Sequence, residues 1–407
     1  MIESKANQKN YYKWVILAII WIGIFSPNYT QYQLSPIAGS LMQSMNLSPA
    51  QFSSVFSAPM IPGLLFALIT GSLFDRFGAR KLCSIYMAIA AVGTVLRVFA
   101  CDYATFFGSM PIACLSATVL NTNGIKIIGT WFPIHQVLKV MAVFLAASTL
   151  ATTVAIGTTA RFSSVMSAFI FAAVLAVAAA VLIIIFMRDG KPAAAADVRQ
   201  PAAPSVRESL KVVGTSRGCW FIALAYMFAY GSTLSLTPFL PSALASRGVD
   251  TVTAGEICSL ASLGSLIGCF MPFFTGKLKN PKPLMLICGC ISAAGAAFAW
   301  LLPVGPMQSV VFFLTGAASG AGMPLLMSWP LKLREIGIKY AGTDRGLLAM
   351  VGLFGAIVLP TYVIVPIAAN NYHTLFALSG ICMILYVFFI TLLPNGDHER
   401  KERTNVE

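Results

Sequence analysis

Charge gathers in one short stretch of this chain. Residues 71–81, GSLFDRFGARK, hold one acid and three bases between two long apolar runs, although only 10% of all residues are charged. A catalytic loop, a phosphate cradle and a mechanical joint between helices are the candidates. A phosphate-binding loop needs Gly-Lys-Ser/Thr after a strand, and this stretch has neither. We expect a joint, with a purely topological role for the charges as the alternative.

Lys126 is the next group that could do chemistry. It lies three residues after Asn123 and therefore on the same face of a helix. An ionisable side chain in an apolar helix is a functional candidate by default. We expect Lys126 to bind an anionic substrate, with Asn121 or Asn123 as a hydrogen-bond donor. The alternative is that the lysine reaches the membrane surface or pairs with a loop acid such as Asp75.

Arg97 and several aromatic residues are further candidates. Arg97 either faces a cavity or serves as an interfacial anchor, alone or paired with Asp102. The segment SPNYTQYQLSP carries Tyr29 and Tyr32, and so many hydrogen-bonding groups would be costly against lipid. We therefore expect a polar lumen, with ordinary hydrogen bonds between helices as the alternative. The remaining candidate lining residues are Tyr226, Tyr230, Trp329 and Lys332.

Residue types that the sequence lacks narrow the possible coupling and catalytic chemistry further. No Asp or Glu falls in the middle of an apolar run, whereas coupling to protons or sodium commonly uses an intramembrane carboxylate. Uniport or anion exchange is therefore favoured over proton symport. The sequence has no Ser/His/Asp grouping, no paired carboxylates and no metal-ligand spacing. We expect no catalytic residue, no metal and no cofactor, and hence not an enzyme.

Composition indicates the elements that must hold these residues. The chain has 407 residues, 57% of them hydrophobic, and a mean hydropathy of +0.80. So much apolar surface requires lipid as its solvent, and apolar runs of about 20 residues without alternation favour helices over a barrel. We expect an all-α membrane protein with twelve transmembrane helices. We place them at residues 12–34, 50–74, 82–101, 104–127, 138–158, 163–187, 219–245, 252–275, 284–303, 308–330, 343–369 and 373–393.

The basic residues indicate which helix ends face the cytoplasm. If alternate connections are placed inside, starting with the N-terminus, that side holds 23 of the 27 basic residues. The exceptions are Arg97, Lys126, Arg161 and Arg247. This asymmetry is the positive-inside rule, with both termini cytoplasmic. The net charge of +13 is therefore a topology signal and not a sign of nucleic-acid binding. We expect a multi-pass protein of the cytoplasmic (inner) membrane.

A polar segment divides the chain into halves. Residues 188–218 are rich in Ala, Pro and charge and fit a cytoplasmic linker. We expect a cytoplasmic N-terminus at 1–11, bundles of six helices at 12–187 and 219–393, and a cytoplasmic tail at 394–407. Two equal halves are the sequence trace of a transporter repeat, in which the substrate binds between the bundles.

The chain resembles the major facilitator superfamily of secondary transporters, and most of all its organic-anion and monocarboxylate members. TWFP at 130–133, after helix 4, and YAGTDRG at 340–346, at the start of helix 11, are similar to sequences of that family. A departure is Val137-Leu138, where an Arg-Gly pair is usual. The most specific match is the family's signature between helices 2 and 3, whose defining positions are Gly71, Asp75, Arg76, Gly78, Arg80 and Lys81.

The resemblance implies where these residues act. Helices 1, 4, 7 and 10 line the cavity in this family, and the signature acid, here Asp75, faces the start of helix 11. Residues 71–81 would then latch against helix 11 when the inner gate is closed. We expect a monomeric transporter that moves a small anion by rocker-switch alternating access, with membrane lipid around it. The alternatives are drug or metabolite efflux, which predicts tolerance of Lys126→Ala, and a non-transporting membrane sensor.

Overall fold

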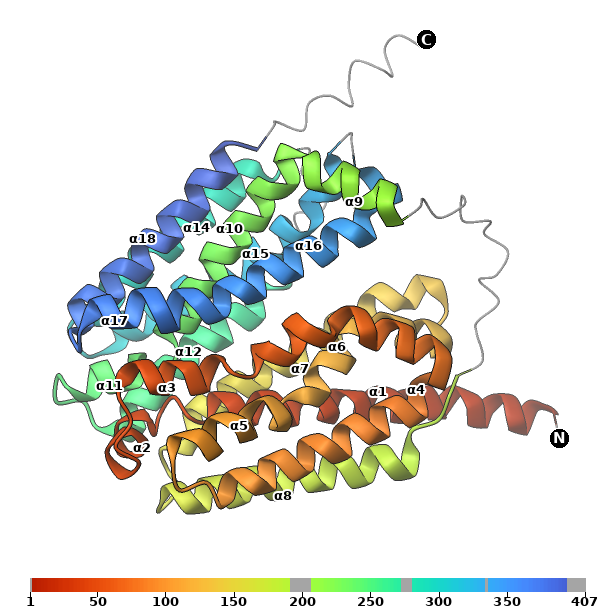
Figure 1. Cartoon of the computed structure of the whole chain (residues 1–407), viewed down its shortest axis with the longest axis horizontal. Coiled ribbons are helices and arrows are strands. Elements are labelled where there is room, and N and C mark those ends of the chain that lie inside the picture. The colour runs from red at the N-terminus through yellow and green to blue at the C-terminus, as the bar shows by residue number, and fades with distance from the viewer. Residues whose placement is uncertain (1, 191–205, 272–279, 334–335, 394–407) are drawn as a thin grey trace, which may run out of the picture. The chain divides into compact units, whose positions relative to one another are not determined.

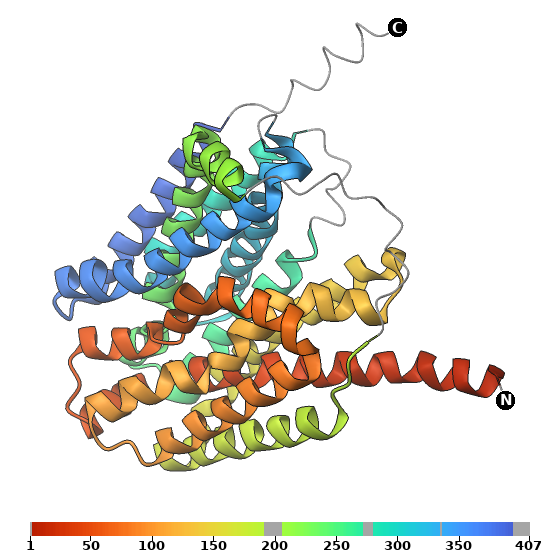
Figure 2. The same ribbon diagram turned by 45° about the vertical axis from the view of Figure 1, so that its right-hand side comes forward.

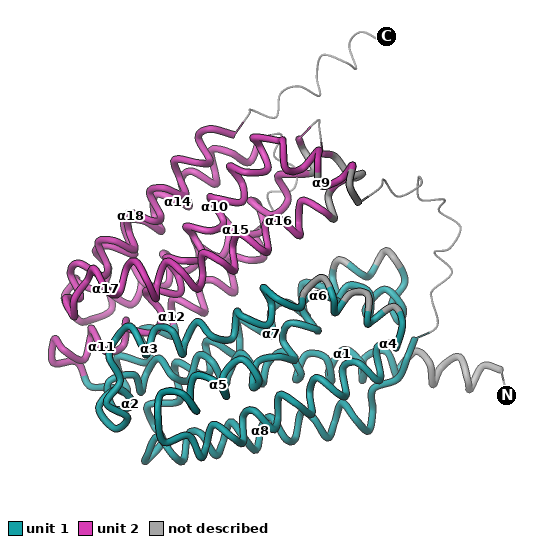
Figure 3. Tube along the Cα trace, viewed as in Figure 1, with its two compact units in different colours: residues 1–199, 250–259 teal, residues 200–249, 260–407 magenta. Residues whose placement is uncertain are grey.

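The computed structural model (Figure 1) describes residues 2–190, 206–271, 280–333 and 336–393. Every regular element in these ranges is helical, and none of them contains a strand. The chain forms two compact units (Figure 3). Unit 1 comprises residues 1–199 and 250–259, and unit 2 comprises residues 200–249 and 260–407.

Unit 1 contains a series of helices from the first half of the chain. They are α1 (Ile2–Tyr32), α2 (Ala38–Ser44), α3 (Pro49–Ser57), α4 (Met60–Val98), α5 (Tyr103–Ala113), α6 (Leu115–Trp131), α7 (Ile134–Thr159) and α8 (Val165–Phe186). The helix α12 (Thr251–Gly268) begins in unit 1 and ends in unit 2.

Unit 2 is built from the remaining helices. They are α9 (Val206–Thr215), α10 (Arg217–Leu236), α11 (Leu240–Ala245), α14 (Lys282–Phe298), η2 (Ala299–Leu301), α15 (Pro306–Ser328), η3 (Trp329–Lys332), α16 (Gly337–Val358), η4 (Leu359–Ile364), α17 (Val365–Ala368) and α18 (Tyr372–Thr391).

Ten helical stretches of the described residues are long and apolar enough to cross a membrane. They match the predicted spans except 12–34 and 50–74. The first of these is helical within α1, but polar residues such as Asn28 and Gln31 lower its hydropathy. The second is interrupted at Ala58, between α3 and α4. The protein is therefore all-helical where it is described and multi-pass, while the number twelve stays a prediction.

Unit 1 packs around α1 and α4. Helix α1 contacts α6, α7 and α8, and α4 contacts α5, α6 and α8; α4 and α8 lie side by side in both ribbon views (Figures 1 and 2). Almost fully buried side chains such as Ile24, Leu120 and Phe144 fill the core. Helix α8 is apolar on every side and exposes Val174 and Ile185, as a helix does where it faces lipid.

Unit 2 packs around α10 and α14. Helix α10 contacts α16 and α18, and α14 contacts α15 and α18. Ile222, Leu326 and Ile390 are fully buried between these helices. This packing fixes the positions of the polar side chains on α10 and α16 relative to each other.

Within unit 2, α12 and α15 pack so closely that only glycine, which has no Cβ atom, fits at the points of contact. Each helix carries a Gly-x-x-x-Gly sequence, at 264–268 and at 316–320. A Cβ atom on the first glycine of α12 would lie 2.0 Å from the carbonyl oxygen of Phe313, and one on the first glycine of α15 would lie 1.8 Å from that of Ala261. Small residues at this spacing bring membrane helices together, and here main chain meets main chain.

Candidate functional site

Arg97 lies in the core of unit 1, and its side chain is fully buried. Its Nη1 donates a hydrogen bond of 2.6 Å to the carbonyl oxygen of Thr30, and its guanidinium carbon lies 4.3 Å from the ring centre of Phe169. The N–H of Leu34 bonds to Gln31, so α1 itself leaves the Thr30 carbonyl open. Arg97 therefore caps the C-terminal end of α1, where a cation is favoured.

Arg97 is neither an anchor at the membrane interface nor paired with Asp102. Asp102 is exposed and caps α5, because its carboxylate accepts hydrogen bonds from the hydroxyl and the backbone N–H of Thr105. The amide of Gln33 lies against the guanidinium of Arg97 instead. No acid pairs with Arg97 among the described residues. A role of Arg97 in substrate binding stays a prediction.

Three predicted residues on α6 differ in their accessibility. Lys126 is exposed, and its Nζ lies 5.8 Å from the ring centre of Phe74. Asn121 is exposed as well. Asn123 is fully buried; its Nδ2 donates to the carbonyl oxygen of Val119 at 3.1 Å, and its Oδ1 has no hydrogen-bond partner. Lys126 and Asn121 are thus exposed, while Asn123 is buried within unit 1.

The two tyrosines of α1 also differ. Tyr29 is buried, stacks on Phe25 with ring centres 6.1 Å apart, and meets Phe171 edge-on at 5.5 Å. Tyr32 is partly buried and meets Phe56 edge-on at 5.6 Å. The aromatic contacts of Tyr29 join α1 to α8, so Tyr32 is the more accessible of the two.

In unit 2, Tyr226 and Tyr230 form a stacked pair on α10, with ring centres 5.5 Å apart. Helix α16 makes room for them, because a Cβ atom on Gly352 would lie 2.1 Å from Cε1 of Tyr226. Arg345 lies two turns before Gly352 on the same face of α16. It is exposed. No acid pairs with Arg345 among the described residues.

The anion-binding potential of Arg345 follows from its chemistry. A guanidinium is always charged and presents paired N–H donors that match carboxylate and other oxyanions. In the sequence, Arg345 is one of the bases that mark the cytoplasmic side. Its spacing of seven residues from Gly352 puts both on one face of a helix, but only the structure shows that Gly352 packs against α10.

Asp344 is a second residue that sequence analysis misses. Helix α16 begins at Gly337, so Asp344 lies inside the helix, and its side chain is 1% exposed. Neither carboxylate oxygen has a nitrogen or oxygen partner among the described residues, and the thiol of Cys219 lies beside it. A carboxylate is therefore present in a buried part of unit 2.

The other two predicted residues of unit 2 lie in η3. Trp329 begins η3 and is 1% exposed, within the core of the unit. The side chain of Lys332 lies outside the described residues.

The signature at 71–81 turns at Gly78, whose φ of 79° and ψ of 168° separate two helical segments of α4. A Cβ atom at Gly78 would lie 2.9 Å from Oδ1 of Asp189. The backbone N–H of Arg80 donates to the same oxygen at 2.9 Å. Asp189 thus caps the second segment of α4, a role that the sequence does not reveal because it spans 109 residues.

Three other signature residues are basic, and their side chains are described. Arg76, Arg80 and Lys81 are exposed, and the guanidinium of Arg76 lies 5.3 Å from the ring centre of Phe77. The side chain of Asp75 and the surroundings of Gly71 lie outside the described residues. The contact of Asp75 with the start of the helix predicted at 343–369 therefore stays a prediction.

Comparison with known proteins places these residues in a family. The probable nitrate/nitrite transporter NarK2 of Mycobacterium tuberculosis is 24% identical over 352 residues, which cover 84% of this chain and 85% of that protein. A gallate transporter of Pseudomonas putida is 34% identical over 93 residues, which cover 23% of this chain and 20% of that protein.

The solved structure of the nucleoside transporter NupG shares the fold. It has a TM-score of 0.73 at 15% identity and covers 93% of this chain and 99% of that one. A sequence model described as Major Facilitator Superfamily matches residues 17–360, which include both the Gly78 turn and the Arg345 group. This chain belongs to the Major Facilitator Superfamily of membrane transporters and is not an enzyme.

Proposed function

We propose that this protein carries a small anion, organic or inorganic, across the cytoplasmic membrane as a monomer. The observation that carries the proposal is Arg345, an exposed guanidinium with no paired acid among the described residues, on the same helical face as Gly352, which packs against Tyr226 of the Tyr226–Tyr230 stack. Lys126 supplies an accessible cation in unit 1. The names of the nitrate/nitrite and gallate relatives support an anion, because all three of these solutes carry negative charge.

The mode of transport follows from the family. We infer alternating access between the bundles 12–187 and 219–393, with both termini in the cytoplasm and with residues 71–81 as the latch of the inner gate. An anion would then be held by cationic groups while the two bundles exchange the side from which it is accessible. Uniport or exchange is the simplest form of this cycle.

Uptake into proteoliposomes tests the substrate class. Wild-type protein and Arg345→Ala are compared on a panel of nitrate, nitrite, benzoate, gallate and a lipophilic cation, with Arg217→Ala as the matched loss of an exposed arginine in unit 2. We expect uptake of at least one anion and a rise of about tenfold in its half-saturation concentration for Arg345→Ala, since a charge-assisted hydrogen bond contributes about 1.5–3 kcal/mol. Arg217→Ala should resemble the wild type.

Two results would contradict this function. Transport of the lipophilic cation alone, with full tolerance of Arg345→Ala and Lys126→Ala, would favour efflux. Anion uptake that is unchanged in Arg345→Ala would remove the observation on which the proposal rests.

Asp344 makes proton symport the second candidate for coupling. A buried carboxylate inside a membrane helix is a usual proton carrier in transporters, and Asp344 has that position in α16. An inward proton gradient separates the two modes. Stimulation of uptake by the gradient that is lost in Asp344→Asn would favour symport, and gradient-independent uptake would favour uniport or exchange.

A further inference from the structure

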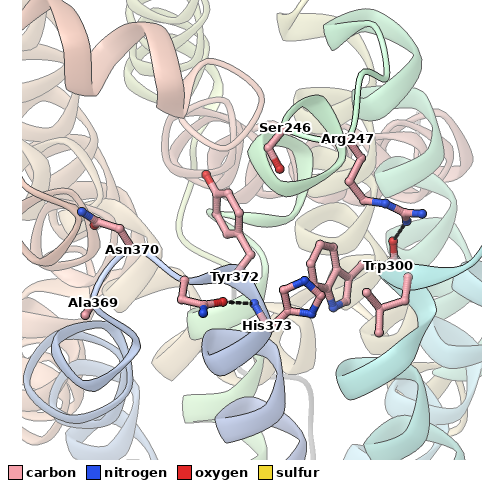
Figure 4. Close-up of a pocket in the computed structure, with 9 residues that line it drawn as sticks. Ser246, Arg247, Trp300, Ala369, Asn370, Tyr372 and His373 are labelled. Carbon is pink, nitrogen blue, oxygen red and sulfur yellow. Dashed lines mark hydrogen bonds between the residues drawn. The ribbon is translucent and has the colours of Figure 1, made fainter.

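Unit 2 contains a cavity of about 540 Å³ at the N-terminal end of α18. Figure 4 shows its walls, which come from the residues after α11, from η2 and from the loop between α17 and α18. The topology expected from the basic residues places this end outside the cytoplasm. Its volume lies within the range of small-molecule sites. The lining residues are Ser246, Arg247, Trp300, Leu301, Ala369, Asn370, Asn371, Tyr372 and His373.

Arg247 is the charged group of this cavity, and it is held in place. Its Nη1 donates to the backbone carbonyl oxygens of Trp300 and Leu302, and its guanidinium carbon lies 5.9 Å from the ring centre of Trp300. Two carbonyl oxygens thus hold one nitrogen of the guanidinium, and the N–H groups of Nη2 and Nε can donate to a ligand. None of the residues that line the cavity is acidic.

The floor of the cavity is aromatic. The rings of Trp300 and His373 meet edge-on with centres 4.8 Å apart, and Trp300 also packs on Phe376 at 4.9 Å. Trp300 is 3% exposed, so it is locked in its position. The exposed imidazole of His373 lies at the edge of the cavity, where its ring N–H can donate a hydrogen bond.

The loop that closes the cavity has an unusual backbone. Ala369 and Asn370 both have positive φ angles, 46° and 69°, and alanine rarely adopts this conformation. Asn371 accepts hydrogen bonds from the backbone N–H groups of His373 and Thr374 with its Oδ1, so its amide nitrogen remains as a donor. Strained backbone of this kind is concentrated at binding sites.

We propose that this cavity is a second anion site, separate from the Arg345 group, which binds the carboxylate of a small aromatic acid. The carboxylate bonds to the free edge of Arg247, with His373 and Asn371 as further donors. The flat body of the acid lies against Tyr372 and Trp300. A phospholipid phosphate offers the same oxyanion chemistry, but the aromatic floor fits a small planar molecule better than a headgroup tethered in the bilayer.

Tryptophan fluorescence provides a direct test, because Trp300 lies in the cavity wall. The protein is placed in nanodiscs of phosphatidylcholine and titrated with benzoate, with inorganic phosphate and with cyclohexylamine, in the wild type and in Trp300→Phe. We expect saturable quenching by benzoate that is absent in Trp300→Phe, and no response to the amine. Quenching that is equal in both proteins would place the ligand elsewhere and overturn the proposal.

Variants of Arg247 test the role of its charge. Arg247→Ala should raise the half-saturation concentration for benzoate by about tenfold, and Arg247→Lys should raise it less because the charge remains without the fork. Arg161→Ala, which removes an exposed arginine of unit 1, is the matched control and should leave binding unchanged. Thermal unfolding confirms that the variants are folded. Arg247→Lys keeps the test valid if Arg247→Ala does not fold.

Three results would overturn the assignment. Benzoate affinity that is unchanged in Arg247→Ala and Arg247→Lys would exclude the arginine. A response to phosphate that equals the response to benzoate would exclude recognition of the aromatic body. Loss of benzoate binding when phosphatidylglycerol replaces phosphatidylcholine would assign the cavity to a lipid headgroup. Because the readout is binding at Trp300, none of these results depends on whether Arg345 acts in transport.

Discussion

Arg97 in unit 1 and Arg345 in unit 2 are two arginines of apolar helices that have opposite surroundings. Arg97 is fully buried, with a backbone carbonyl, an amide and an aromatic ring around it. Arg345 is exposed and has no paired acid among the described residues. The comparison teaches that a charge in a membrane helix has a structural role when the protein already supplies its partners. When the protein supplies no such partners, the charge can bind a ligand.

Replacing Arg97 should have the largest effect on stability. Arg97→Ala leaves the Thr30 carbonyl buried without a donor and removes the contact with Phe169, which together cost about 3 kcal/mol. We expect a clear fall in the thermal unfolding midpoint, and a smaller fall for Arg97→Lys. Full stability of Arg97→Ala together with lost substrate binding would reverse the roles assigned to the two arginines.

Replacing Arg345 should affect transport and not stability. Arg345→Lys keeps the charge but loses the paired donors, so we expect the half-saturation concentration for the transported anion to rise about threefold, less than for Arg345→Ala. The unfolding midpoint should stay at the wild-type value, because the side chain is exposed. A fall in the midpoint as large as that of Arg97→Ala would show that Arg345 is also structural.

Gly352→Ala tests whether the position of Tyr226 matters. A Cβ atom there would lie 2.1 Å from the ring of Tyr226, so the ring must move away from Arg345. We expect a moderate rise in half-saturation concentration with a stability loss of about 1–3 kcal/mol from overpacking. The double variant Gly352→Ala/Tyr226→Leu should recover stability but not affinity. Recovery of both would mean that the hydroxyl is dispensable.

Replacing Asp102 should have the smallest effect on the unfolding midpoint. This small effect would distinguish the role of Asp102 from that of Arg97. Hydrogen bonds from the hydroxyl and the backbone N–H of Thr105 lower the pKa of its carboxyl. The stabilisation is therefore complete above the unfolded pKa of about 3.9 and is lost as the pH falls toward the lower folded value. Asp102→Ala should lower the unfolding midpoint slightly at pH 6, and the difference from the wild type should shrink as the pH falls below about 3.9. A pH-independent difference would contradict the capping role.

Composition and spacing predict much of the fold because lipid imposes a simple rule. Long apolar runs such as 163–187 must be helices in a membrane, and the structure has α8 there. The polar run around Tyr29 is harder to predict, because its residues lower the hydropathy of α1 and their partners lie on other helices. The turn at Gly78 is expected from the signature, whereas its partner Asp189 is distant in sequence.

The candidate site is predicted less well for a physical reason. Lys126 is accessible as the sequence suggests, but the same reasoning treats Arg97 as equivalent, since a single sequence does not show that α1 ends at a free carbonyl beside it. Arg345 and Asp344 are adjacent, and one is exposed while the other is buried. Such a difference depends on the rotation of α16 against α10, which residue spacing alone does not determine.

The glycine contact between α12 and α15 has a mechanical consequence. A side-chain interface absorbs small displacements by changes of rotamer, but two backbones in direct contact have no rotamers to change. A displacement of one helix in the region of residues 264–268 should therefore move residues 316–320 of the other with it, and enlarging any of the four glycines should loosen this coupling.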